Sequence, residues 1–133
     1  MNPVLVYRIA KPLSEADPAV REALKSQGFG ILTEVNVTAT LREKLGIETR
    51  PYTILGACNP KIAHQAMSIE PNVGAFLPCG IALYEGANPG ETIAAIQDPG
   101  IIGTAFAAPG LVGPAGEARE KLQAALAQVG EAV

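Results

Sequence analysis

The chain of 133 residues contains 48% hydrophobic, 5% aromatic and 17% charged residues and has a net charge of −3. This length is typical of one domain, here residues 1–133, and the scarcity of aromatic residues predicts an aliphatic core. The ten Lys and Arg residues are scattered, which argues against the clustered basic face of nucleic-acid-binding proteins.

Strand and helix patterns follow one another along the chain. Runs that are β-rich or alternating predict strands over residues 4–9, 30–37, 51–58, 80–85 and 91–96. Periodic apolar residues with start and stop signals predict helices over residues 18–27, 38–45, 60–70 and 114–129. A Gly- and Pro-containing turn over residues 86–90 joins the last two strands, which predicts a hairpin. The order β-α-β-α-β-α-β-β-α does not alternate strictly and favours the α+β class.

Three of these elements carry more detailed expectations. Pro18 fits the first position of a helix and Gly28 its terminator. Residues 51–58 are apolar on both faces, so we expect this strand to lie inside the sheet. The next helix begins after Asn59, and its core-facing side chains are expected to be Ile62, Ala63, Ala66 and Met67.

Residues 99–116 form an uncharged stretch of 18 residues with five Gly and three Pro. This composition predicts a loop rather than a membrane helix. Its large apolar side chains either cover the domain's own core or form an exposed patch that a dimer or a ligand would bury. They are Ile101, Ile102, Phe106, Leu111 and Val112.

Two cysteines in a chain of this length are too few for a secreted disulfide framework. Residues 1–8 lack the basic and apolar regions of a signal peptide. We therefore expect a cytoplasmic location and no membrane span.

Short motifs between residues 28 and 85 resemble a known family. They are Gly28-Phe29-Gly30, Thr33-Glu34, Ala39-Thr40-Leu41, Arg50-Pro51-Tyr52, Leu55-Gly56-Ala57-Cys58-Asn59-Pro60, Ala63-His64, Glu70-Pro71 and Leu77-Pro78-Cys79. In these residues the chain resembles the bacterial and archaeal family called domain of unknown function 302. The resemblance implies a curved, mostly antiparallel sheet of about five strands backed by helices, similar to TATA-binding-protein-like folds, and a homodimer. It implies no established activity.

Cys58 is the main candidate for chemistry because it ends a strand directly before a helix begins. Unpaired N–H groups at a helix start favour negative charge, so a thiol there is expected to have a lowered pKa. The alternative is a small buried side chain that only packs.

His64, the only histidine, follows Cys58 by six residues and either is exposed or folds back toward Cys58. Cys79 precedes the next strand and would meet Cys58 at one rim of the sheet if the two strands are antiparallel neighbours. Two thiols and an imidazole suit zinc or copper(I), although the sequence offers no CxxC motif and no fourth ligand.

Arg50 and Tyr52 lie at the entry of the strand that ends on Cys58. Arg50 either holds an anion or is solvated or ion-paired. The complete set of candidate ligand-binding residues is Arg50, Tyr52, Cys58, Asn59, His64 and Cys79.

Three functions are compatible with these residues. The first is a non-catalytic binding domain whose cysteine-centred site holds zinc, copper, a haem-type cofactor or a small apolar ligand. The second is a thiol enzyme, with Cys58 as nucleophile or redox centre, His64 as base and Cys79 as resolving thiol. The third is a homodimeric interaction module without such a site.

Overall fold

All the strands belong to one antiparallel sheet. The computed structural model describes residues 2–133, in which the strand order is β2-β3-β4-β5-β1-β6. The inner position of β3 and the β4–β5 hairpin confirm the sequence predictions. The strands are β1 (Val4–Ile9), β2 (Gly30–Asn36), β3 (Tyr52–Cys58), β4 (Cys79–Glu85), β5 (Thr92–Gln97) and β6 (Glu131–Ala132).

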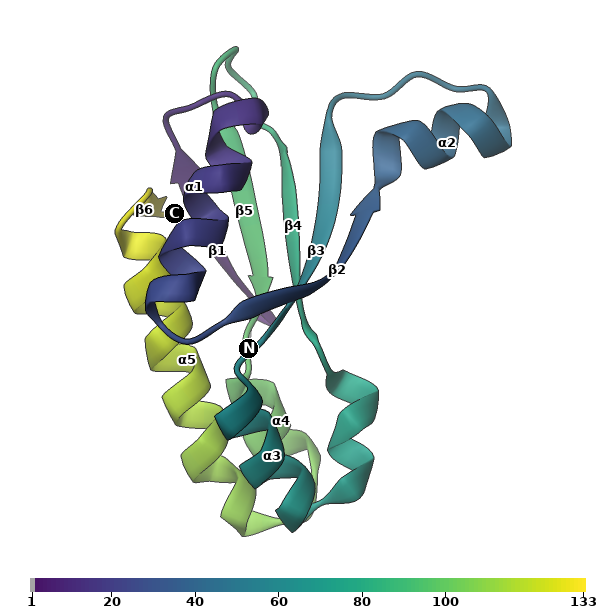
Figure 1. Ribbon diagram of the computed structural model, residues 1–133. Helices are drawn as coiled ribbons and strands as arrows, with labels where there is room; N and C mark the ends of the chain where they lie inside the picture. The colour runs from purple at the N-terminus through teal and green to yellow at the C-terminus, as the bar shows by residue number, and fades with distance from the viewer. Residues whose placement is uncertain (1) are drawn as a thin grey trace.

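Helices cover one face and one end of this sheet. Helices α1 and α5 lie against one face, α3 and α4 gather beyond one end of the strands, and α2 stands apart beside β2 and β3 (Figure 1). The helices are α1 (Leu13–Ser26), α2 (Val37–Leu45), α3 (Pro60–Ile69), α4 (Gly100–Ala105) and α5 (Val112–Ala127), with short 3₁₀ segments η1 (Pro71–Phe76) and η2 (Pro109–Leu111). The α+β class with a sheet backed by helices is therefore confirmed, with one strand more than expected. That strand, β6, has two residues and is too short to leave a pattern in the sequence.

The main core lies between the helix-covered face of the sheet and the two long helices. Side chains alternate between the two faces of a strand, so every second residue of the inner strands points into this core. The strands contribute Tyr7, Ile9, Leu55, Ala57, Ile81, Leu83, Ala94 and Ile96, and the helices contribute Ala16, Val20, Ala23, Leu24, Leu122, Ala125 and Leu126.

Helix α1 begins earlier than the sequence signals suggested. It starts at Leu13, directly after Pro12, and Pro18 lies inside it. Ala16 is fully buried and shares its face with Val20, so the apolar stripe extends N-terminal to Pro18 and the helix extends with it.

Residues 99–116 were expected to be a loop, and that expectation is wrong. They form α4, η2 and the first turn of α5. Burial of Ile102, Leu111 and Ala115 in a second apolar cluster outweighs the low helix propensity of glycine here. These residues cover the domain's own core, whereas Val112 stays exposed.

Helix α3 differs from the prediction at one residue. Ile62, Ala63 and Ala66 are buried as expected, but Met67 is 41% exposed. Within residues 2–133, every helix is too short or too polar to span a lipid bilayer.

Two paired glycines allow a direct test of sheet packing. Gly56 and Gly80 lie opposite each other in β3 and β4. A Cβ on Gly56 would clash with the Thr33 hydroxyl and lie 2.6 Å from Cγ of Pro78, whereas a Cβ on Gly80 would meet nothing within 4 Å. We expect Gly56→Ala to lower the free energy of unfolding by about 1–3 kcal/mol through overpacking. Gly80→Ala is the matched control and should change it by less than about 0.5 kcal/mol in urea titrations. Equal effects would contradict this packing.

Candidate functional site

The structure separates the six candidate ligand-binding residues into three places. Cys58, Asn59 and Cys79 line a narrow apolar cavity. Arg50 and Tyr52 line an open hollow beside α2, and the only histidine lies in a shallow hollow on another side of α3. They therefore do not form one site.

The cysteine-lined cavity lies where the end of β3 and the start of β4 meet the helices at the end of the sheet. Its volume is about 40 Å³. Such a space holds one or two water-sized groups. Most of the remaining wall is apolar and includes Phe29, Ile62, Ala66, Val73, Leu77 and Leu111.

Pairing of β3 with β4 brings the two cysteines close to each other. Ala57 lies opposite Cys79, so Cys58 is one residue beyond the directly paired position, and both cysteines line the cavity at this end of the two strands. The two cysteines therefore border the same cavity at one rim of the sheet. Both are free thiols, with Cys58 half-buried and Cys79 buried.

The environment of the thiols opposes ionisation. Burial raises the pKa of Cys58. Burial, together with the negative charge of a Cys58 thiolate, raises the pKa of Cys79 to about 11. The expected lowering of the Cys58 pKa is therefore wrong, and both thiols are protonated near neutral pH. The helix start is capped instead by Asn59, whose side-chain oxygen accepts the N–H of Ile62 at 3.3 Å.

Asn59 joins two helices as well as capping one. Its side-chain amide nitrogen donates to the carbonyl of Gln27 at 3.3 Å, at the end of α1. Both ends of the amide are thus used within the protein, which gives Asn59 a structural role at the cavity wall.

His64 does not join the cysteines. It is exposed, and its neighbours in the shallow hollow include Ser68 of α3 and Glu117 of α5. Ile62, Ala63 and Ala66, by contrast, line the cysteine cavity, so His64 lies on another face of α3. No group of three His, Cys, Asp or Glu side chains within residues 2–133 is placed to hold a metal ion. The expected three-ligand set of Cys58, His64 and Cys79 is therefore not formed.

The hollow beside α2 is lined by residues that the sequence prediction mostly missed. Its volume is about 620 Å³, and its apolar wall includes Val37, Leu41 and Tyr84. The ring of Tyr52 stacks on that of Tyr84, with centroids 5.3 Å apart and planes 9° apart. Tyr52 and Tyr84 pair directly across β3 and β4, so strand pairing could have identified this wall, although the hollow itself also depends on the position of α2.

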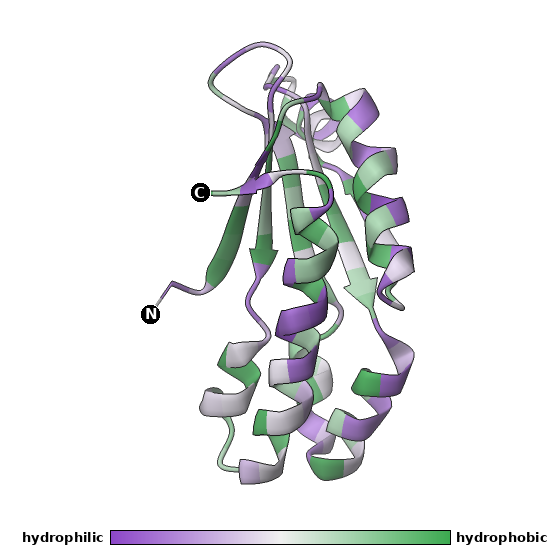
Figure 2. Ribbon diagram, turned by 90° about the vertical axis from the view of Figure 1, so that its left-hand side faces the viewer, coloured by the Kyte–Doolittle hydropathy of each residue, from purple (hydrophilic) through white to green (hydrophobic). Residues whose placement is uncertain are grey.

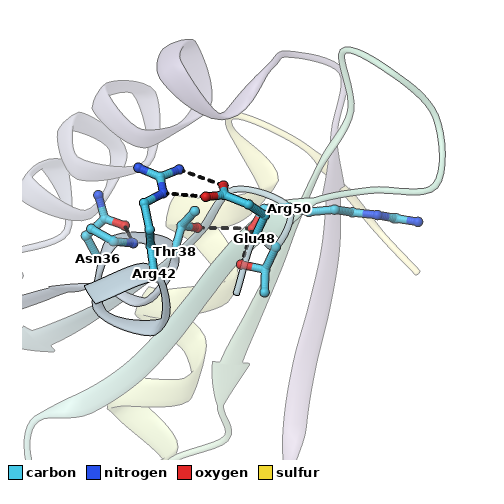
Figure 3. A network of polar contacts seen from close by, with 7 residues as sticks. Asn36, Thr38, Arg42, Glu48 and Arg50 are labelled. Atoms are coloured by element: carbon cyan, nitrogen blue, oxygen red, sulfur yellow. Dashed lines mark hydrogen bonds and ion pairs between the residues drawn. The ribbon is translucent and has the colours of Figure 1, made fainter. Parts of the chain in front are cut away.

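Arg50 connects this hollow to the β4–β5 turn. One of its guanidinium N–H groups donates to the carbonyl of Gly86 at 3.3 Å. Figure 3 shows the Arg50 side chain extending away from the polar contacts at the base of α2. Its contact with Gly86 is structural and leaves other N–H groups of the guanidinium without a described partner.

Comparisons with known proteins agree with this fold and supply no activity. A crystal structure of an uncharacterised conserved DUF302 protein from Bacillus stearothermophilus is similar to this chain, with 28% sequence identity and a TM-score of 0.87. The match covers 97% of this chain and 99% of that one. A search of curated proteins finds no match. The family model described as domain of unknown function DUF302 matches residues 6–129, and the chain therefore belongs to this family.

Proposed function

We propose that this chain is a homodimeric binding module, with a second copy of itself as its first partner. The observation that supports this most directly is the face of the sheet opposite α1 and α5. Ile54 and Val35 on that face are 39% and 46% exposed. Contiguous apolar surface of this kind on a monomer marks an interaction site. Symmetric pairing is the commonest way to bury it.

The cysteine cavity supports a second, smaller binding function. Two free thiols in the lining of one apolar cavity suit a single soft ion such as copper(I), which thiolates bind strongly. Zinc and haem fit this cavity less well. Structural zinc requires four ligands, and a haem is far larger than a cavity of about 40 Å³.

Thiol catalysis has less support than binding. Its nucleophile would be Cys58, whose pKa is raised by burial. Its base would be His64, which lies on another face of α3. The free state of both thiols is compatible with a reducing compartment such as the cytoplasm.

Light scattering of the untagged protein tests the homodimer. We expect a mass about twice the 13.7 kDa of one chain at micromolar concentration, decreasing on dilution. A mass of one chain at every concentration up to millimolar would refute the proposal.

Alkylation of the thiols tests the cavity. At pH 7 iodoacetamide should label Cys58 more slowly than free cysteine, and Cys79 only after unfolding, because the thiolate is the reactive form. Raising the pH through the usual thiol range near 8.5 should accelerate labelling of Cys58. One equivalent of copper(I), added without oxygen, should suppress labelling of Cys58 in the native chain and much less in the Cys79→Ser variant. Unchanged labelling in the presence of copper(I) would assign both cysteines to packing alone.

A further inference from the structure

We infer that two copies of this chain pair through the uncovered face of the sheet, and that the α2 arm of each copy packs against the other copy. The uncovered face is the face opposite α1 and α5, and the α2 arm comprises residues 37–50. This inference rests on the proposed homodimer and specifies which surface forms it.

The uncovered face carries an uninterrupted apolar row across five strands. Directly opposed residues of neighbouring strands lie on the same face of a sheet. The register therefore links Val6, Ala95, Ala82, Ile54 and Val35 in one line from β1 to β2. None of these residues is charged. The two alanines on the central strands have small side chains, so the surface is slightly recessed in the middle of the row.

The neighbouring row carries a single charge, at its edge. It runs from Arg8 through Ile93 and Tyr84 to Tyr52. Figure 2 shows the strands from the side, mostly in the green of hydrophobic residues, with the helices against one side of them. Two such faces can therefore meet without desolvating a central charge.

The α2 arm packs only loosely against its own chain, at β2 and β3. None of the nine residues of α2 is buried. Beyond the arm's base, Leu45 is 67% exposed and Ile47 is 45% exposed. A helix of this length is marginal in isolation and gains stability mainly by packing an apolar side. The arm therefore leaves apolar surface that a second chain can cover.

Polar contacts nevertheless hold the arm in one position. The Thr38 hydroxyl donates to the carbonyl of Arg50 at 3.0 Å and accepts the N–H of Tyr52 at 2.8 Å. Arg42 and Glu48 form two parallel hydrogen bonds of 2.9 and 3.0 Å across the end of the helix (Figure 3). These contacts preorganise the arm, so that less conformational entropy is lost when it docks.

The hollow of about 620 Å³ between the arm and the sheet completes the match. Each chain presents an unfilled hollow whose wall is mostly apolar, with Arg50, Glu85 and Glu91 also in its lining. Each chain also presents exposed apolar side chains on its arm that can fill such a hollow. In a two-fold dimer the same contact is made twice, so one chain supplies both complementary parts.

The area of the surface makes the arm necessary. The two rows of side chains across five strands give about 300 Å² of flat sheet on each copy, from standard strand spacings. A stable interface buries ~800 Å² per partner. Contacts from the arm supply the difference.

Three matched variants test this inference by sedimentation equilibrium beside the wild-type chain. Ile54→Glu places a charge within the apolar row of the uncovered face, and Leu45→Glu places one on the arm. Met67→Glu is the control, because Met67 is similarly exposed but lies on α3, at the other end of the molecule. We expect the first two to raise the dimer dissociation constant at least tenfold and the control to leave it within about twofold, because a buried unpaired charge opposes association.

The outcomes separate the interface from the homodimer itself. A dimeric wild type whose Ile54→Glu and Leu45→Glu variants stay equally dimeric would overturn this interface and leave the homodimer intact. A wild type that is monomeric throughout would overturn both. Circular dichroism and thermal melting confirm that each variant is folded, and Leu45→Glu keeps the test decisive because Leu45 is too exposed to be needed for folding.

Discussion

An antiparallel sheet has two faces, and the helices of this chain cover only one of them. Helices α1 and α5 bury the row of Leu5, Ile96, Ile81 and Leu55, whereas the adjacent apolar row from Val6 to Val35 is left without a helix. The solvated face of an antiparallel sheet usually carries polar residues, so an apolar row on the uncovered face is unusual. The position of α2, the open hollow beside it and the absence of charge along the row all become intelligible if a second chain covers this face.

The cysteines occupy a different part of the molecule and are subject to a different constraint. Cys79 lies in the wall between the sheet and the helices beyond its end, where burial raises its pKa and limits access. Both ends of the Asn59 amide form hydrogen bonds at helix ends, the nitrogen at the end of α1 and the oxygen at the start of α3. The main role of these residues is therefore packing and helix capping, and any ligand that binds in this region must be small.

Much of the fold was predictable because its signals are local. The alternation of β2, the glycine that ends α2 and the turn between β4 and β5 each depend on a few consecutive residues. The helices of residues 99–116 were missed because their stability comes from burying Ile102 and Leu111 against distant elements. For the site, strand pairing brings Cys58 and Cys79 to the same cavity at one rim of the sheet. The direction in which His64 points was not predictable, since it depends on how α3 packs against the sheet and α5. The hollow was missed because it forms only where α2 stands away from the sheet, a tertiary feature without a local pattern.

Hydroxyl-radical footprinting at low and high protein concentration tests the central claim most directly. If a second chain covers the uncovered face, labelling of Tyr52, Tyr84 and Ile54 should fall as the concentration rises. Labelling of Phe76, which is 37% exposed in η1 and lies outside that face, should stay constant. Equal labelling of the three residues at both concentrations, in a sample whose mass shows it to be dimeric, would place the interface elsewhere and contradict the account.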